Sequence, residues 1–316
     1  MARIVVALGG NALQANPKDT SAEAQLKTCH ETSKAIADLI EDGNEVIIAH
    51  GNGPQVGQII ATYEAANSVD SSKPVMPFPE CGAMSQGYIG YHLQQSIRQE
   101  LVRRGIKKQV AAVITQVVVD KDDPGFKNPS KPVGSFFTKD QAEILMKEKG
   151  YVMKEDAGRG WRRVVASPMP VSVVEEGIIK SLVDGGHVVI TVGGGGVPVI
   201  EKEDGSLEGV PAVIDKDLAS EKIAELLNAD MLLMLTAVEK ISLNYNKPNQ
   251  RDLSVMTVKE AEEYMLEGHF APGSMLPKVK AAVMFASSKQ GRESIVTSLE
   301  KAREALKGQT GTKIIL

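Results

Sequence analysis

Short apolar segments rich in β-branched residues alternate along this chain with longer stretches of helical periodicity, and this alternation restricts the fold more than any other feature. The expected strands are residues 4–8, 45–49, 110–119, 188–192, 231–235, 294–297 and 313–316. They are continuously apolar, as in strands buried on both faces, and the helices between them imply right-handed crossovers. The sequence therefore predicts an α/β fold, with three αβα layers around an open, mostly parallel sheet.

Helix starts are marked by capping-box patterns, in which Ser or Thr is followed three residues later by Glu or Gln. The pattern occurs at residues 20–23, 138–141, 172–175 and 257–260. The first of these helices is expected to end at Gly43, since glycine readily adopts the conformation that terminates a helix.

Residues 120–170 interrupt the alternation, because they are polar and rich in proline. A connection of this length needs a structure or a function of its own, so we expect a small inserted subdomain there. With 316 residues the whole chain is long enough for one large domain built from two lobes.

Composition excludes several classes of function. The formal net charge is -4, so no overall basic field would draw the chain to nucleic acid or to anionic lipid. Two cysteines, Cys29 and Cys81, do not make a disulfide framework and favour a reducing compartment. No apolar run approaches the ~20 residues that span a bilayer, and the N-terminus does not have the pattern of a signal peptide. We expect a cytoplasmic protein without nucleic-acid or membrane partners.

Three glycine turns follow expected strands. They are Gly9-Gly10-Asn11, Gly51-Asn52-Gly53 after His50, and residues 193–196. Glycines let backbone N–H groups approach an anion, and the helix that follows the second turn adds partial positive charge. The first turn alone is better explained as a tight strand-to-helix connection, and His50 as a packed residue. Three such turns at the carboxyl ends of parallel strands nevertheless predict an anion crevice.

Two further segments place charge at helix starts. Asp215, Lys216 and Asp217 lie where an extended run becomes a helix, and Lys278 lies in the first turns of a helix after a Pro-Gly turn. The local pattern alone favours a simple aspartate cap. Lysine is unfavourable at this end of a helix dipole unless an anion is also present, which hints at function.

Neither standard glycine-rich nucleotide motif occurs. The chain has no G-x-x-x-x-G-K-[ST] loop and no G-x-G-x-x-G fingerprint, which argues against an NAD-dependent oxidoreductase.

Seven segments together resemble carbamate kinases, which belong to the amino-acid kinase fold family. In order they are ALGGNAL, AHGNGPQVG, KPVG at 131–134, GRGWRRVVASPMP, VGGGGVPV, AVIDKDLAS and FAPGSMLPKV. The resemblance runs over nearly the whole chain. The glycine turns are shared with relatives such as acetylglutamate kinase, whereas Lys131 in the inserted segment and the lysine within VIDKD look specific to carbamate kinases.

The resemblance implies roles for individual residues. Backbone and amide donors to the small anion and the travelling phosphoryl group would come from Gly9, Gly10, Asn11, Gly51, Asn52 and Gly53. Lys131 would reach the site from the inserted segment, acting as a lid. Lys216 and Lys278 would approach from the other side, and Asp217 would hold the lysines in place.

The resemblance also divides the single domain, residues 1–316, into two lobes. Residues 1–227 would bind the small anion and carry the lid at about 120–170, and residues 228–316 would bind the nucleotide. The expected nucleotide-binding residues are Gly194, Gly195, Asp215, Tyr245 and Met275. Mg²⁺ would accompany ATP or ADP, held mainly through the nucleotide phosphates rather than by a protein metal site. A homodimer is also implied.

The implied reaction is reversible: ATP and carbamate give ADP and carbamoyl phosphate. The expected physiological direction is ATP synthesis, in arginine catabolism by the deiminase pathway or in purine catabolism. Carbamate is already an anion and needs no general base, which agrees with a site of glycines and lysines. We expect the clustered lysines to repel one another without an anion, so that their removal would not lower stability. Another small-anion kinase of the same fold and an inactive nucleotide-binding regulator remain alternatives.

Overall fold

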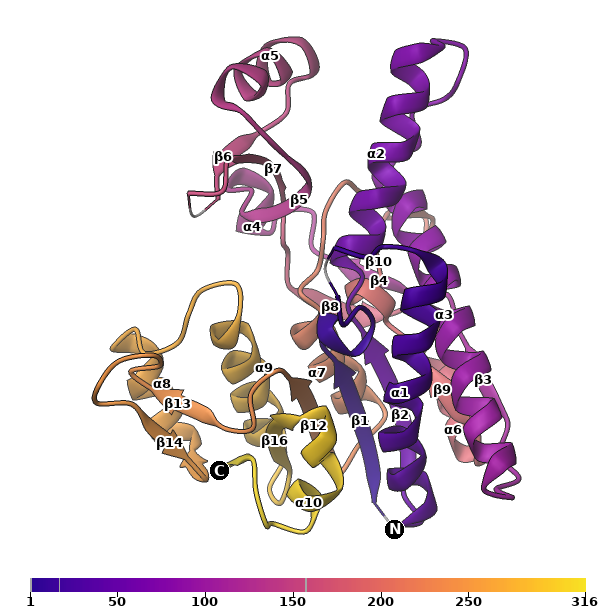
Figure 1. Cartoon of the computed structure of the whole chain (residues 1–316), viewed down its shortest axis with the longest axis vertical. Helices are drawn as coiled ribbons and strands as arrows, with labels where there is room; N and C mark the ends of the chain where they lie inside the picture. Colours follow the sequence, from indigo (N-terminus) through magenta and orange to yellow (C-terminus); the bar gives the residue numbers. More distant parts are fainter. Residues whose placement is uncertain (1, 17, 157) are drawn as a thin grey trace.

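The computed structural model describes residues 2–16, 18–156 and 158–316, and an eight-stranded sheet forms its centre (Figure 1). In spatial order the strands are β15 (Val255–Thr257), β17 (Thr312–Ile315), β16 (Glu293–Ser298), β12 (Met231–Thr236), β1 (Arg3–Leu8), β2 (Glu45–His50), β9 (Val188–Ile190) and β3 (Val110–Ala112). Neighbouring strands are parallel except β16 and β17. The predicted open, mostly parallel sheet is confirmed.

Helices cover both faces of this sheet, and others lie outside it. The helices of the described residues are α1 (Ala22–Glu41), α2 (Gly53–Val69), α3 (Phe78–Arg103), α4 (Pro124–Lys127), α5 (Lys139–Lys149), α6 (Glu176–Asp184), α7 (Lys216–Leu226), α8 (Val258–Leu266), α9 (Met275–Ser288) and α10 (Ala302–Leu306). Successive residues of β1 point to opposite faces: Ile4 and Val6 pack with α1, α3 and α10, whereas Val5 and Ala7 belong to a core with α6 to α9. Both faces of β1 are therefore buried, which explains its continuous apolar run.

Two smaller sheets flank the central one. A four-stranded sheet has the order β11 (Leu207–Gly209), β10 (Val197–Glu201), β4 (Gln116–Val119) and β8 (Pro170–Val173). A hairpin of β13 (Ile241–Leu243) and β14 (Arg251–Leu253) lies in the C-terminal part of the chain.

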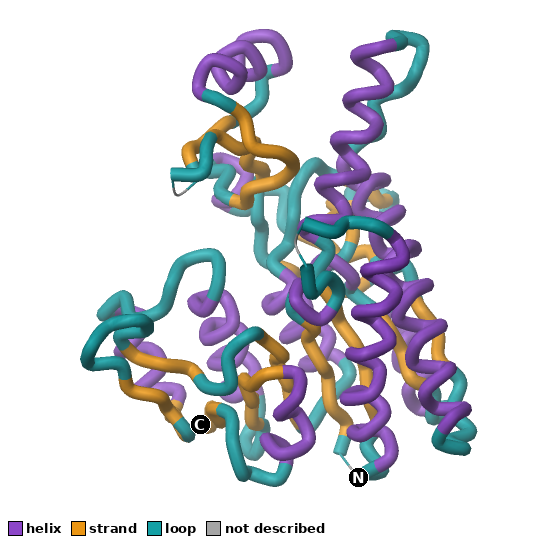
Figure 2. Tube along the Cα trace, in the orientation of Figure 1, coloured by secondary structure: helices purple, strands orange, loops and turns teal. Residues whose placement is uncertain are grey.

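A third small sheet lies within the polar segment for which we expected an inserted subdomain. Its order is β5 (Lys131–Phe137), β7 (Trp161–Val165) and β6 (Met153–Glu155), and α5 packs on β7. We call residues 131–165 the small subdomain. In Figure 2 it stands beside α2, against which β5 packs. The predicted capping box of α5 is present, with Thr138 and Gln141 bonded reciprocally.

The expected strand at 110–119 is in fact two strands in different sheets, β3 and β4. The break lies at Thr115, a fully buried residue whose hydroxyl donates a hydrogen bond to the Val113 carbonyl at 2.8 Å. The side-chain oxygen of Gln86 accepts from the Thr115 N–H at 2.8 Å. These side-chain bonds replace ladder bonds and redirect the chain, which an apolar run does not reveal.

Two of the four expected capping boxes are also wrong. The cap of α1 is Ser21, whose hydroxyl accepts from Ala24 N–H, so the pattern at 20–23 is one residue out of register. Ser172 lies in β8, and α6 begins only at Glu176. The Glu175 carboxylate instead accepts from the backbone and side-chain N–H groups of Gln116, fixing the start of β4. The box at 257–260 is present at the start of α8.

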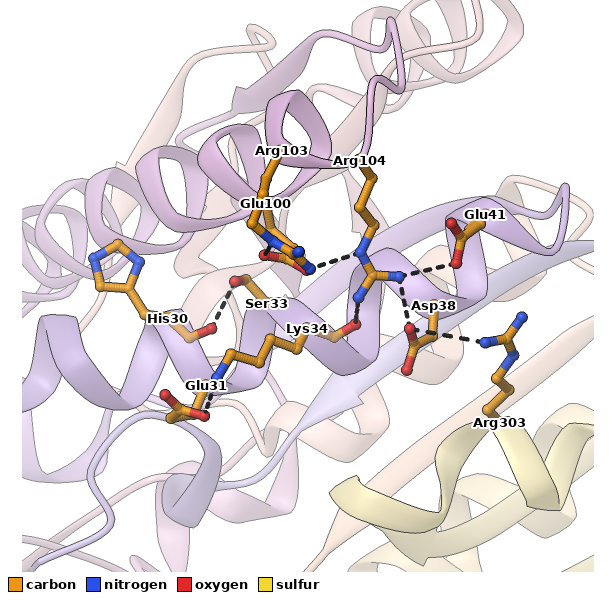
Figure 3. A network of polar contacts seen from close by, with 10 residues as sticks. All are labelled: His30, Glu31, Ser33, Lys34, Asp38, Glu41, Glu100, Arg103, Arg104 and Arg303. Carbon is orange, nitrogen blue, oxygen red and sulfur yellow. Dashed lines mark hydrogen bonds and ion pairs between the residues drawn. The ribbon is translucent and has the colours of Figure 1, made fainter.

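A network of ion pairs joins α1, α3 and α10 (Figure 3). The Arg104 guanidinium donates to Glu100 at 2.8 Å and to Asp38 at 2.6 Å. Hydrogen bonds from Arg103 and Arg104 lower the pKa of Glu100 to about 2 although burial opposes the shift. The network therefore fixes the C-terminal end of α3 against α1, although Arg104 and Asp38 are 66 residues apart in the sequence.

Glu221, in the second turn of α7, has a buried carboxyl group. The residue is 2% exposed, and its Oε2 has no hydrogen-bond partner among the described residues. Burial raises the pKa of Glu221 from 4.5 to about 7. Because the folded state holds this proton more tightly, stability is highest below the ordinary pKa and is lost as pH rises towards 7 and above.

We therefore predict that Glu221→Gln raises the free energy of unfolding at pH 8.5 by about 2–3 kcal/mol and changes it little at pH 5. Urea unfolding at the two pH values measures both quantities. Glu262→Gln, an exposed glutamate on α8, is the control and should leave the pH profile unchanged. An equal effect of Glu221→Gln at both pH values would contradict the assignment.

Candidate active site

The first two glycine turns lie side by side, because β1 and β2 are parallel neighbours. The N–H of Gly9 donates to the Leu235 carbonyl at 3.2 Å and that of Gly51 to the Leu8 carbonyl at 3.3 Å, so both groups hold the turns onto the sheet. Gly10, Asn11 and Gly53 are exposed. Gly53 is also the first residue of the 17-residue helix α2, where free N–H groups and the helix dipole favour an anion.

The third turn follows β9, next to β2, and packs against the second. A Cβ on Gly194 would lie 2.1 Å from Asn52 Nδ2, and one on Gly195 would lie 2.2 Å from the Ile214 carbonyl oxygen. Both glycines also have positive φ. The turn begins at Val192, which is fully buried with φ 43°, an unusual conformation for a β-branched residue. Only glycine fits where these loops approach so closely.

Asp215 caps α7, as the local sequence pattern favoured. Its Oδ1 accepts from the Asp217 N–H at 2.9 Å, and α7 begins at Lys216. The other carboxylate oxygen, Oδ2, accepts from Lys131 Nζ at 2.7 Å. Asp215 therefore serves both as the cap of α7 and as the ion-pair partner of Lys131, the first residue of β5.

Asp217 joins the other two lysines. Its Oδ1 accepts from Lys216 Nζ at 2.5 Å and its Oδ2 from Lys278 Nζ at 3.1 Å. The Asp217 side chain is 4% exposed, and the two lysine side chains are 15% and 13% exposed. Three lysines from well-separated segments thus meet over two carboxylates, which leaves the group with a net charge of +1. Such an excess of positive charge favours an added anion.

Burial and charge set the protonation of this cluster. Burial lowers the pKa of Lys216, although the adjacent Asp217 opposes the shift. Burial alone would raise the pKa of Asp217, but the Lys216 and Lys278 ammonium groups outweigh it and hold that pKa below its ordinary range. Asp217 is therefore a carboxylate at neutral pH, able to orient both lysines.

His50 is packed, as expected, at the end of β2. It is 1% exposed, its Nδ1 lies 2.9 Å from the Gly51 carbonyl oxygen, and burial lowers its pKa to about 4. A Cβ on Gly193 would lie 2.5 Å from His50 Nε2. The neutral imidazole packs against the glycine turns at Gly51 and Gly193 and does not add to the charge of the site.

Lys216 also touches the second glycine turn, which links the lysines to the exposed glycines. A Cβ on Gly51 would lie 3.4 Å from Lys216 Cδ, so the lysine stem runs directly past this glycine. Asn52 is held beside it by a hydrogen bond from Nδ2 to Ser85 Oγ at 2.8 Å.

A cavity of about 260 Å³ lies on the other side of the lysines and contains both Tyr245 and Met275. Its wall includes Thr236 at the end of β12, and Ser274, whose carbonyl accepts from Lys278 Nζ at 3.3 Å. The cavity therefore adjoins the lysine cluster, and its mostly apolar lining suits a flat heterocycle.

Most residues that line this cavity were not predicted from the sequence, among them Thr236, Lys240 and His269. The position of Thr236 at the carboxyl end of a central strand was the available signal. Gly194 and Gly195, expected to bind nucleotide, are buried and do not line the cavity. Their assignment stays a prediction.

Neither a metal-binding cluster nor a membrane-spanning helix is present in the described ranges, 2–16, 18–156 and 158–316. No group of three or more His, Cys, Asp and Glu side chains is placed there to hold a metal ion. None of the helices in those ranges has the length and apolar character needed to cross a membrane.

Comparison with known proteins gives consistent matches. The sequence profile described as the amino acid kinase family matches residues 2–298. The chain is 60% identical to a carbamate kinase of Clostridium perfringens, with 99% of each chain covered, and 52% identical to one of Pyrococcus horikoshii, with 99% and 98% covered. The solved structure of carbamate kinase from Giardia lamblia bound to AMP-PNP superposes with a TM-score of 0.92 at 42% identity, covering 99% of this chain and 98% of that one.

Proposed function

This chain belongs to the amino acid kinase family, and from that premise we propose that it is a carbamate kinase that transfers a phosphoryl group reversibly between ATP and carbamate. The observation that carries the proposal is the convergence of Lys131, Lys216 and Lys278 between the exposed glycine turns and the cavity. The relatives named above, at 60% and 52% identity over almost their whole length, support the same substrate pair.

In the forward reaction a carbamate oxygen forms a bond to the γ-phosphorus of ATP while the bond from that phosphorus to the bridging oxygen breaks. ADP leaves with the electron pair of that bond on its terminal phosphate oxygen. Catalysis then consists of in-line placement and charge stabilisation. Gly10, Asn11 and Gly53 would bind the small anion, and the three lysines would follow the negative charge of the phosphoryl group as compact point charges.

No residue is needed as a general base, because carbamate is already ionised. His50 agrees with this, since it is buried and its pKa of about 4 keeps it neutral. Asp217 would be a positioning group: its two oxygens hold Lys216 and Lys278 at a fixed separation. Asp215 would hold Lys131 until substrate arrives.

The residues present fit a magnesium ion that enters with the nucleotide. All four oxygens of Asp215 and Asp217 already accept hydrogen bonds, so the ion would be held mainly through the nucleotide phosphates. Bound Mg²⁺ would neutralise charge on the nucleotide phosphates. Tyr245 and Met275 would contact the adenine ring in the cavity.

We also propose the division of labour that the sequence suggested. Residues 1–227 would bind the anion and residues 228–316 the nucleotide, with the small subdomain as a lid that brings Lys131 to the site.

Carbamoyl phosphate is a mixed anhydride and a strong phosphoryl donor. We therefore propose ATP synthesis as the working direction, in the cytoplasm, at the end of arginine catabolism by the deiminase route or of purine catabolism.

A homodimer is proposed as the assembled form. β3 is an edge strand of the central sheet, and the apolar side chains of Tyr91, Ile114 and Ile178 on the elements around it are exposed. An unpaired strand edge with apolar neighbours suits an isologous contact with a second copy. Sedimentation equilibrium should give twice the 33.9 kDa chain mass, and a monomer at micromolar concentration would contradict the proposal.

Luminescent ATP detection tests the activity. Purified protein with ADP, Mg²⁺ and fresh carbamoyl phosphate should form ATP, whereas acetyl phosphate, acetylglutamyl phosphate and aspartyl phosphate should give far lower rates. ATP formation mainly from acetylglutamyl phosphate would mean a different small-anion kinase. No ATP from any donor, with ADP still bound, would mean a nucleotide-binding regulator.

A further inference from the structure

The position of Lys131 depends on how the small subdomain is held. Lys131 is the first residue of β5 and therefore the residue at which the small subdomain begins. Its side chain is 31% exposed, and among the described residues its side chain bonds to the site only through the ion pair with Asp215. The contacts between the small subdomain and the rest of the protein therefore decide where this ammonium group stands.

The first of these contacts is an apolar cluster separate from the two large cores. It brings Val133 of β5 and Val165 of β7 against Val56 and Ile60 of α2, with Phe78 and Cys81 of α3 completing it. This cluster joins the base of the small subdomain to α2, and it does not include the charged site. Apolar contact alone fixes the distance between two surfaces better than their angle, because it is not directional.

A directional contact lies further out along the same helix. The Tyr151 hydroxyl, between α5 and β6, donates a hydrogen bond to Glu64 Oε1 on α2 at 2.8 Å. The Arg163 guanidinium of β7 lies over the Tyr151 ring, 3.8 Å from its centroid. Tyr151 is thus held on one side by its own subdomain and on the other by α2. All three side chains also line a cavity of about 350 Å³ at this junction.

The helix that receives this hydrogen bond is the one that begins at the anion site. α2 runs from Gly53 to Val69, so Glu64 and Gly53 belong to one rigid element, about 16 Å apart at 1.5 Å per residue. β5 also passes close to the start of α2, where a Cβ on Gly57 would lie 3.5 Å from Gly134 Cα. Fixing the small subdomain to α2 therefore fixes Lys131 relative to Gly53.

We propose that Tyr151 and Glu64 are positioning residues, whose hydrogen bond holds the small subdomain at a set angle on α2 and so places Lys131 Nζ over the anion bound at Gly53. This rests on the proposed function, which assigns Lys131 its role. Neither residue touches substrate. Their loss acts through the misplacement of a charge that must meet the phosphoryl group in the transition state.

Tyr151→Phe removes only the hydroxyl. It should lower kcat for ATP formation by about tenfold while the KM for ADP stays within about twofold, since the nucleotide cavity is untouched. Glu64→Ala should give the same fall, and the double variant should be no slower than either single one, because both remove one bond. Glu64→Gln keeps an acceptor oxygen and should recover most of the rate. Tyr63→Phe, the neighbouring tyrosine on α2, is the matched control and should match wild type.

Hydrogen–deuterium exchange without ligand gives an independent readout. Peptides from residues 131–156 should exchange faster in Tyr151→Phe and Glu64→Ala than in wild type, Glu64→Gln or Tyr63→Phe, while peptides from β1 and β12 stay unchanged. Unchanged exchange in Tyr151→Phe would overturn the proposal whatever the activity. Losses of rate that add in the double variant would also overturn it, as would an effect confined to the KM for ADP. Wild-type protein that makes no ATP would instead refute the proposed function, and exchange would still decide the role of Tyr151.

Discussion

Alanine at any one of Lys131, Lys216 or Lys278 will lower the rate of ATP formation by about two to four orders of magnitude. All three ammonium groups would act on the same small volume of phosphoryl charge, so each removal takes away stabilisation that the other two do not replace. Losses in double variants should be smaller than the sum of the single losses, because the lysines act as a unit. Arginine should restore little, since a planar fork does not replace a compact ammonium group.

The same variants test the electrostatics of the empty site. The sequence led us to expect mutual repulsion of the lysines and no loss of stability on their removal. The structure differs, because each lysine has a carboxylate partner. Lys216→Ala would leave buried Asp217 with one partner, and should lower the unfolding free energy by about 1–3 kcal/mol without ligand. Thermal melts and ATP-forming rates measured on the same preparations check both expectations. A variant that keeps more than about a tenth of the wild-type rate would remove that lysine from the catalytic set.

Asp217→Asn will reduce turnover by about a hundredfold or more, with little change in the affinity for ADP. Asparagine preserves the shape and one acceptor oxygen, but it removes the charge that holds Lys216 and Lys278 at 2.5 Å and 3.1 Å. Asp215 is the cap of α7, so loss of the helix start would not explain the result. Initial rates over a range of ADP concentrations separate turnover from binding.

Asp215→Asn is the comparison variant for this experiment. Asparagine is as good a helix cap as aspartate, so α7 should keep its start while Lys131 loses its ionic partner. Asp217→Asn with near wild-type turnover would show that the two lysines need no carboxylate to place them.

Much of the fold could be predicted because its signals are local. Continuous apolar runs identified most strands of the central sheet, and glycines after β1, β2 and β9 identified the crevice at their ends. The split of residues 110–119 could not be predicted, because it depends on the long-range bond between Gln86 and Thr115. The same limit applied to Glu175, whose partner Gln116 lies 59 residues away.

The site shows the same contrast between local and long-range information. The resemblance to carbamate kinases supplied the three lysines, and the pattern around Asp215 supplied the helix cap. The resemblance assigned the lysines to Asp217, and Lys278 does pair with it across 61 residues. Neither signal indicated that Lys131 would instead pair with Asp215, across 84 residues. The hydrogen bond from Tyr151 to Glu64 also had no signal in the sequence, because both residues lie in ordinary helical or polar surroundings.

A crystal structure with MgADP and aluminium fluoride, a mimic of the phosphoryl group in transfer, would show where that group lies relative to the three lysines. We expect fluoride ligands within hydrogen-bonding distance, about 3 Å, of the Nζ atoms of Lys131, Lys216 and Lys278. We also expect the adenine ring between Tyr245 and Met275, and the opposite face of the mimic turned to Gly10 and Gly53. Aluminium fluoride bound away from the lysines, or adenine bound outside this cavity, would contradict the proposed site.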